Sequence, residues 1–292
     1  MQRRAMLTTA GLALAAPRPA AAQAWPARPI RIIVPFPPGG PNDIIARLYA
    51  PQLQAILGQG VVLENRGGGG GVVGTDAALK ASPDGTTFAI TNGGSLVITP
   101  HVSANMPYRV PDDMTLVSVV TLVPEALVAN PRLGVKTLAE LVALAKREPG
   151  RLNIGTAGAA GISHLAAELF RVQTGTDVVV VPYRGAAPAV TDIVAGQIGL
   201  LFADLPVILP QIRAGTLTAL AMASERRSPV LPDLPTTAEQ GFPGLLADNW
   251  YCMVAPPRLP EAILERMSAA LRTASETPAV RDALAAQGAQ AV

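Results

Sequence analysis

The order of apolar and polar positions along the chain alternates between two kinds of segment. Short runs rich in β-branched and aromatic residues have the length of buried strands, and longer segments with apolar residues three and four apart predict amphipathic helices. The expected strands cover residues 30–35, 61–64, 87–91, 117–122, 126–129, 152–155, 178–181, 199–202, 217–222 and 250–254. The expected helices cover residues 43–57, 72–80, 137–147, 162–174, 186–195, 205–213, 236–240, 260–275 and 278–286. This alternation is typical of α/β folds in which helices cover both faces of parallel sheets.

The composition indicates a globular protein large enough for two hydrophobic cores. Of the 292 residues, 49% are apolar and 15% are charged, which excludes a disordered chain. The formal charge of +2 includes Arg3, Arg4 and Arg18, without which 20 Lys and Arg residues stand against 21 Asp and Glu residues. This balance indicates no nucleic-acid partner.

The first 24 residues predict a cleavable export signal. Arg3 and Arg4 form a charged start, residues 7–16 form a short apolar core, and Ala22-Gln23-Ala24 is a small-x-small cleavage site. Cleavage after Ala24 would release the mature protein into the periplasm. The paired arginines leave Sec and twin-arginine export both open, and the apolar core is too short to span a bilayer.

The sequence PIRIIVPFPPGGPND at residues 29–43 predicts an anion-binding turn. An apolar strand enters a loop of prolines and glycines, and a helix follows, whose first N–H groups lack intrahelical acceptors and carry a partial positive charge. A carboxylate can be held there without Arg or Lys. Asn42 or Asp43 is expected to cap the helix, with a contact from Asp43 to a ligand amine or hydroxyl as the alternative. The candidate ligand contacts in this turn are Phe36, Pro38, Gly39, Gly40, Asn42 and Asp43.

A similar turn follows the strand expected at residues 152–155. Small residues lead into the next helix, so that the Thr156 hydroxyl and several backbone N–H groups are free to meet a second carboxylate. His164, in the first helical turn, is expected to pack or cap, with ligand contact as the alternative. The candidate contacts are Thr156, Ala157, Gly158, Ala160, Gly161, Ser163 and His164. Two facing anion sites imply a ligand with two acidic ends.

Other kinds of chemistry lack the residues they require. The glycines at residues 67–71 do not form a dinucleotide fingerprint and are not followed by a Walker lysine, so no cofactor is expected. One cysteine and two distant histidines predict no metal site. No G-x-S-x-G elbow is present, and we expect no enzymatic activity. Cys252 is expected to be a buried strand residue that forms no disulfide.

Eight segments in register give the chain a family resemblance. They are PFPPGGPND at 35–43, ENRGGGGGVVG at 64–74, SPDGTT at 82–87, LNIGTAG at 152–158, VPYRGAAPAVTDIVAGQI at 181–198, LPVILPQIRAGTLTALA at 205–221, RSPVLPDLPTTAEQGFPG at 227–244, and Trp250 with Ala255-Pro256. On these segments the chain resembles the Bug-type periplasmic solute receptors of tripartite tricarboxylate transporters. The resemblance runs from Trp25 to about Gln287.

The resemblance implies a type II periplasmic-binding-protein fold, with two doubly wound α/β lobes joined by two crossover strands. Lobe 1 would comprise residues 25–124 and 251–292, and lobe 2 residues 125–250. It adds Gly94, Ser95, Tyr183 and Asp204 as ligand-site candidates, with Tyr183 helping to close the cleft. The chain would be a monomer that captures a small carboxylate and delivers it to the transporter's membrane permease.

Two questions stay open at the level of sequence. The same fold could serve a sensor subunit that signals to a membrane kinase, which is the alternative to transport. In addition, relatives usually continue past the segment ending near Gly288 through another strand and helix, so either the chain is truncated or one sheet edge of lobe 1 is unpaired.

Overall fold

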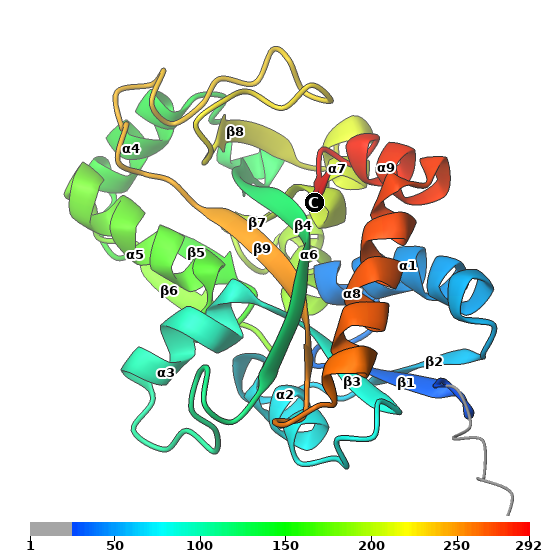
Figure 1. The fold of residues 1–292 in the computed structure, drawn as a ribbon. Coiled ribbons are helices and arrows are strands. Elements are labelled where there is room, and N and C mark those ends of the chain that lie inside the picture. The colour runs from blue at the N-terminus through cyan, green and yellow to red at the C-terminus, as the bar shows by residue number, and fades with distance from the viewer. Residues whose placement is uncertain (1–24) are drawn as a thin grey trace, which may run out of the picture.

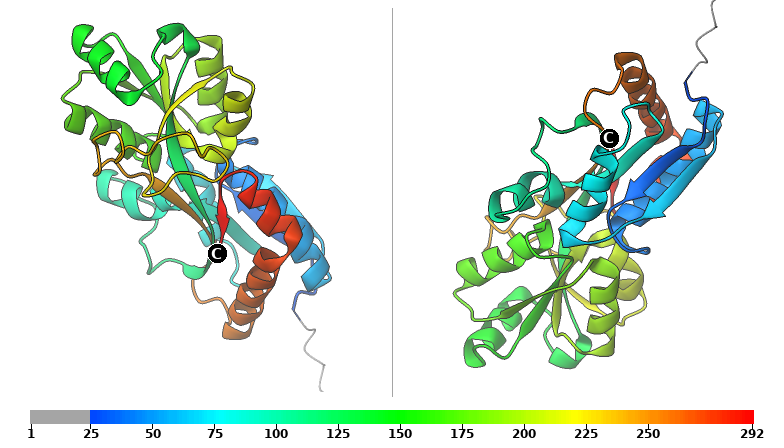
Figure 2. Two further views of the ribbon diagram at one scale, coloured as in Figure 1. Left: turned by 90° about the horizontal axis from the view of Figure 1, so that it is seen from above. Right: turned by 90° about the horizontal axis from the view of Figure 1, so that it is seen from below.

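The computed structural model describes residues 25–292, so the predicted export signal at residues 1–24 lies outside the described residues. Figures 1 and 2 show two α/β lobes, one built from the first and last parts of the chain and one from its middle. The strands are β1 (Ile30–Val34), β2 (Val61–Asn65), β3 (Thr87–Asn92), β4 (Thr115–Ala129), β5 (Asn153–Thr156), β6 (Val179–Pro182), β7 (Leu200–Asp204), β8 (Thr218–Met222), β9 (Asp248–Ala255) and β10 (Gln290–Ala291).

The α-helices are α1 (Pro41–Leu57), α2 (Val72–Leu79), α3 (Thr99–Val102), α4 (Leu138–Arg147), α5 (Ile162–Thr174), α6 (Ala186–Ala195), α7 (Leu205–Arg213), α8 (Glu261–Glu276) and α9 (Pro278–Ala285). Short turns of other helix types are η1 (Gly69–Gly71), η2 (Gly94–Ile98) and η3 (Pro131–Leu133). Among residues 25–292, no helix combines the length and the apolar character needed to cross a membrane.

Each lobe is built around parallel strands. In the first lobe β1 lies between β2 and β3, and in the second β5 lies between β6 and β7. Apolar side chains of the first sheet pack against α1, α8 and α9, with Tyr49, Phe88 and Tyr251 fully buried. In the second lobe Phe170 of α5 and Phe202 of β7 are fully buried in a core that α4 also covers. The predicted fold class is confirmed.

Two long strands connect the lobes. β4 pairs with β9 from Thr115 to Pro124, then pairs with β7 and β8 from Glu125 or Ala126 onward. Figure 1 shows β4 and β9 running side by side through the middle of the molecule. The sequence prediction of two strands separated at Pro124 is wrong. Pro124 lies where β4 changes partners from β9 to β7 and β8. The fixed φ of proline is compatible with a strand, and at this point its missing N–H does not interrupt a continuous row of hydrogen bonds between two strands.

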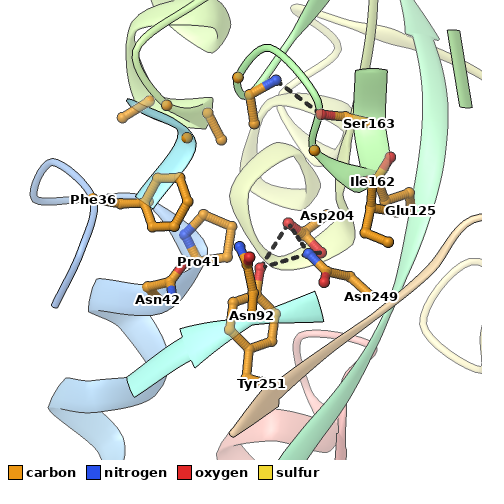
Figure 3. A pocket seen from close by; sticks show the side chains of 18 of the residues that line it. Phe36, Pro41, Asn42, Asn92, Glu125, Ile162, Ser163, Asp204, Asn249 and Tyr251 are labelled. Carbon is orange, nitrogen blue, oxygen red and sulfur yellow. Dashed lines mark hydrogen bonds between the residues drawn. The ribbon is translucent and has the colours of Figure 1, made fainter. Parts of the chain in front are cut away.

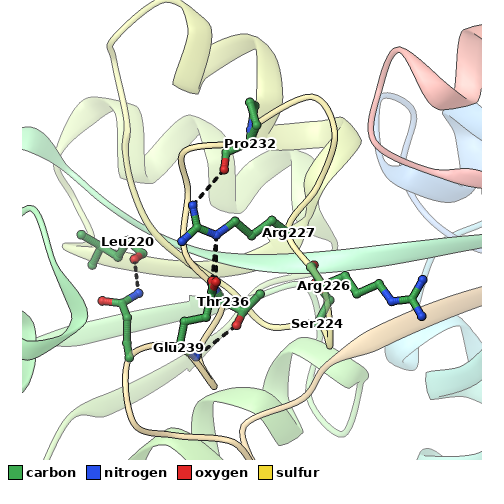
Figure 4. Close-up of polar contacts among 8 residues, drawn as sticks. Leu220, Ser224, Arg226, Arg227, Pro232, Thr236 and Glu239 are labelled. Carbon is green, nitrogen blue, oxygen red and sulfur yellow. Dashed lines mark hydrogen bonds and ion pairs between the residues drawn. The ribbon is translucent and has the colours of Figure 1, made fainter.

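The helix predicted at residues 236–240 is also wrong, because only a turn forms there. The Thr236 N–H donates to Glu239 Oε2 and the Glu239 N–H donates to Thr236 Oγ1, which is the reciprocal arrangement of a helix capping box. Gly241, with φ of 91°, and then Pro243 prevent the helix from continuing. Arg227 bonds both Glu239 and the Pro232 carbonyl, which ties parts of this loop to each other (Figure 4). Gln240 donates to the Leu220 carbonyl of β8, which joins the loop to the second lobe.

The remaining predicted strands and helices agree with the observed ones to within two residues at each end. Near the C-terminus, β10 forms two antiparallel pairs with Thr121 and Leu122 of β4. Cys252 is a buried free thiol in β9, as predicted, and burial raises its pKa to about 12.

Candidate functional site

A cavity lies between the two lobes where strand ends and helix starts from both of them meet (Figure 3). Its volume, measured as space for the centre of a water-sized sphere, is about 30 Å³, which is room for one or two waters. The lining residues are Phe36, Pro37, Gly40, Pro41, Asn42, Gly70, Asn92, Glu125, Ala157, Gly158, Gly161, Ile162, Ser163, Gly185, Ala186, Ala187, Asp204, Asn249 and Tyr251. Eight residues predicted from sequence are among them: Phe36, Gly40, Asn42, Ala157, Gly158, Gly161, Ser163 and Asp204.

The first wall is the turn between β1 and α1. Gly40 is the N-cap of α1, in an extended conformation, and Pro41 is the first helical residue. The helix therefore starts before Asn42 and Asp43, and the prediction that either side chain caps it is wrong. The Asn42 side chain instead donates to the Ile90 carbonyl, 3.0 Å away. The Asn42 N–H has no protein acceptor within residues 25–292, which leaves it available at the cavity.

Asp43 accepts a hydrogen bond from the Gly39 N–H, a group that the sequence analysis predicted to bind a ligand. Its Oδ2 accepts from the Gly39 N–H at 3.0 Å and from Arg47 at 2.8 Å, and its Oδ1 accepts from Asn65. Burial alone would raise the pKa of Asp43, but these hydrogen bonds outweigh burial and lower it. Asp43, Gly39 and Pro38 do not line the cavity, and Asp43 fixes the shape of the turn.

The second wall is the turn between β5 and α5. Gly161 is the extended N-cap of α5, and the cavity is lined by Ala157, Gly158, Gly161, Ile162 and Ser163. The Ala157 N–H is already bonded to Ser163 Oγ at 2.9 Å. Thr156 Oγ1 donates to the Gly158 carbonyl and lies 3.5 Å from His164 Nδ1. Thr156 and His164 thus brace the turn from outside the cavity.

Contacts across the cleft show that the lobes are closed on each other. Thr99 Oγ1 donates to the Ala160 carbonyl at 3.1 Å. A Cβ placed on Gly70 would lie 3.2 Å from the Ala159 oxygen, and one on Gly94 would lie 3.2 Å from the Gly161 Cα. Gly94 and Ala160, predicted as ligand contacts, are therefore lobe-to-lobe contacts, and the glycines of the 67–71 segment permit close backbone approach.

Two further predicted residues lie outside the cavity. Ser95 is buried and its hydroxyl donates to the Gly70 carbonyl, which positions the glycine loop. Tyr183 donates to Asp192 Oδ2 at 2.7 Å within the second lobe. The residues at the cavity from this part of the chain are Gly185, Ala186 and Ala187 at the start of α6, with Gly185 packed on Pro37 of the first lobe.

The floor of the cavity carries two carboxyl groups, from Glu125 of β4 and Asp204 at the end of β7. These residues are register partners on adjacent antiparallel strands, with exposed fractions of 1% and 3%. Asp204 accepts hydrogen bonds from Asn249 Nδ2 at 3.1 Å and from the Tyr251 hydroxyl at 2.9 Å (Figure 3). Glu125 Oε2 is buried with no hydrogen-bond partner among the described residues.

Burial raises the pKa of both floor groups. The pKa of Asp204 rises to about 7, because desolvation outweighs the hydrogen bonds from Tyr251 and Asn249. The pKa of Glu125 is raised well above its usual value, through desolvation and then the negative charges of Asp204 and Asp248. No Lys, Arg or His lines the cavity.

Glu125, Asn249 and Tyr251 were not singled out from the sequence. Asn249 and Tyr251 belong to a long apolar run, and their convergence on Asp204 depends on how β9 crosses beside β4. One signal was present, because Glu125 is a lone charge between LVP and ALVA in an otherwise apolar strand. A buried charge in such a place requires a partner or a function.

Two α/β lobes that close on an interlobe cavity and share two crossing strands define a solute receptor of the periplasmic-binding-protein type. The chain belongs to the tripartite tricarboxylate transporter family receptors, whose family model matches residues 45–292. Receptors of this family are periplasmic solute-binding proteins, a class distinct from enzymes.

Named relatives agree with this assignment. The chain is 40% identical to Protein BugT of Bordetella pertussis over 287 residues, which cover 98% of this chain and 87% of BugT. Its fold matches Rhodopseudomonas palustris Rpa4515 with adipate at a TM-score of 0.89 and 33% identity, covering 91% and 89% of the two chains. It also matches MatC from R. palustris with bound malate at a TM-score of 0.86 and 31% identity, covering 91% and 90%.

Proposed function

We propose that this chain is an extracytoplasmic receptor that captures a small carboxylate between its lobes and delivers it to a membrane permease of the tripartite tricarboxylate type. The observation that carries the proposal is the convergence of two helix N-termini, from α1 in one lobe and α5 in the other, on one cavity. Such N-termini hold carboxylates through backbone N–H groups. Adipate and malate in two structural relatives support a carboxylate ligand.

Capture follows from contacts that exist only in the closed form. A carboxylate solute is larger than the one or two waters that fit the cavity, so the lobes must part to admit it and then close around it. A solute bonded to Gly40 and Asn42 on one side and to Gly158, Gly161 and Ser163 on the other binds the closed state more tightly than the open one. Binding therefore shifts the population of lobe positions toward closure. The closed form is the one we expect a permease to recognise, because its surface exists only when the receptor is loaded.

The binding step is tested by thermal unfolding of the mature protein, residues 25–292, in the presence of di- and tricarboxylates, amino acids and aromatic acids. A ligand at one hundred times its dissociation constant adds about 2.7 kcal/mol to the free energy of unfolding. A concentration-dependent rise in melting temperature for at least one acid, reproduced by calorimetric titration, is the expected result. No shift with any acid at millimolar concentration contradicts the proposal.

The delivery step needs a different experiment, because a sensor subunit would also bind ligand. The loaded receptor is cross-linked to membranes of the source cells and the captured proteins are identified by mass spectrometry. Transporter subunits are expected, whereas a histidine kinase would support the signalling alternative.

Processing and oligomeric state complete the proposal. Cleavage after Ala24 predicts Trp25 as the first residue of protein recovered from the periplasm, which N-terminal sequencing checks. Light scattering during size-exclusion chromatography is expected to give the mass of a monomer.

A further inference from the structure

The cavity floor is chemically unlike its walls. The walls present backbone N–H groups, small or apolar side chains and the neutral amides of Asn42 and Asn92, with no charged side chain among them. The floor presents Glu125 and Asp204, both almost completely removed from solvent. A cavity lined by no cationic side chain therefore ends on two acidic groups.

The two floor carboxyls differ in how well they are satisfied. Asp204 receives donors from Asn249 and Tyr251, whereas Glu125 Oε2 has no partner although it is fully buried. A buried polar atom without a partner costs about 1 to 3 kcal/mol, and more when the group is charged. Because Glu125 lines the cavity, the donor it lacks is one that a bound solute can bring.

A fully anionic solute does not meet this need. A carboxylate extended to the floor brings no hydrogen-bond donor for Glu125 Oε2, and it would repel Glu125 and Asp204 whenever these are ionised. An ammonium group would supply N–H donors to Glu125 Oε2 and would stabilise the ionised form of both carboxyls. Two carboxyls fall short of a metal cage, and no group of three or more His, Cys, Asp or Glu side chains arranged to hold a metal occurs within residues 25–292.

Resting on the proposed receptor function, we propose that the solute is zwitterionic: an amino acid or related amino carboxylate whose ammonium group binds Glu125 and Asp204 at the floor while its carboxylate binds the helix N-termini at the walls. Tyr251 and Asn249 each donate a hydrogen bond to Asp204 and so fix its position at the floor. The raised pKa values of Glu125 and Asp204 agree with carboxyls that lack a counter-charge in the unliganded protein.

The test uses matched pairs of probes that differ only in an amino group. Calorimetric titration at pH 8 compares β-alanine with propionate, 4-aminobutyrate with butyrate, L-glutamate with glutarate, and L-2-aminoadipate with adipate. We expect the amino member of at least one pair to bind at least tenfold more tightly than its partner.

Glu125→Gln is expected to abolish this preference, because the amide keeps the shape of the side chain but removes its charge. Glu265→Gln, the same change at an exposed position of α8, is the matched control and should retain the preference. The melting temperature of each unliganded variant checks that loss of binding is not loss of folding.

The possible results separate the inference from the function on which it rests. If the unaminated acids bind equally or more tightly, and Glu125→Gln leaves or improves their binding, the zwitterion proposal is wrong and the receptor function stands. If no member of any pair binds and the broader acid screen is also negative, both fail.

Discussion

The Thr99 hydroxyl donates a hydrogen bond to the Ala160 carbonyl across the cleft, at an oxygen–oxygen distance of 3.1 Å. Thr99 begins α3 in the first lobe, and Ala160 lies in the turn before α5 with a left-handed φ of 58°. A non-glycine residue in this conformation is strained by roughly 1 kcal/mol. The bond therefore joins the lobes directly, at a turn whose backbone is held in an uncommon conformation.

Thr99→Val is expected to weaken ligand binding about three- to tenfold. The substitution keeps the shape of the side chain but removes a bond that exists only in the closed form, and one such bond contributes about 0.5 to 1.5 kcal/mol. Calorimetric titration measures the dissociation constant. Thr191→Val is the control, because the Thr191 hydroxyl bonds Ala187 within α6 and crosses no cleft. Equal effects from both variants would contradict a role for Thr99 in closure.

Gly94→Ala is expected to impede closure. The new Cβ would lie 3.2 Å from the Gly161 Cα in the opposite lobe and 3.3 Å from Asn92 Oδ1, and backbone gives way less readily than a side chain. Ligand affinity should fall at least fivefold while the melting temperature of the unliganded protein changes little. Gly60→Ala, where the nearest atom is the Pro29 Cβ at 3.9 Å, should bind as the unsubstituted protein does. A large loss of stability without ligand would show that the clash lies within one lobe.

A disulfide between Gly39→Cys and Ala187→Cys is expected to lock the lobes together. A Cβ on Gly39 would lie 3.9 Å from the Ala187 Cβ, within the range for disulfides, although φ of 79° at Gly39 adds some strain. The oxidised double variant should exchange ligand much more slowly than the protein does under dithiothreitol, as measured by stopped-flow fluorescence. Single-cysteine variants control for the substitutions, and the buried Cys252 should not react. Unchanged exchange after confirmed oxidation would contradict closure at this contact.

The two floor carboxyls predict that the unliganded protein loses stability as the pH rises. In the folded protein the pKa of Asp204 is about 7, against 3.8 for an unperturbed Asp side chain, so unfolding releases a proton at pH values between the two. As the pH rises between these two values, the free energy of unfolding should fall by at most about 1.4 kcal/mol per pH unit for each group. The contribution of Asp204 should become constant above its pKa in the folded protein. Asp43 has the opposite effect, because its pKa is lowered in the folded protein: its contribution to stability is lost as the pH falls below the usual range for Asp.

Urea unfolding at pH 5 and pH 7.5 measures this dependence. The double variant Glu125→Gln, Asp204→Asn should show a much smaller difference between the two pH values. Stability that is constant or rises between them in the unsubstituted protein would mean that the floor groups are ionised throughout.

The local sequence was enough to predict most strands and helices and the two backbone turns that form the walls of the cavity. The alternation of strands and helices, the turn before α1 and the turn before α5 depend on residues close together in the chain, so their apolar pattern, prolines and glycines predicted them. The exceptions had competing local signals. At Pro124 a residue that usually ends strands lies inside a long one, and at Thr236 a capping box forms without a helix behind it.

Only the tertiary structure decided which groups meet at the cavity. Glu125, Asp204 and Tyr251 are far apart in sequence and converge because β4 crosses between β7 and β9, a register that long-range pairing determines. The Gly39 amide looked free in sequence, yet Asp43 reaches back to it once α1 begins at Pro41. Local propensity fixes where backbone donors can occur, whereas burial and strand register fix which of them stay unpaired and what charge they face.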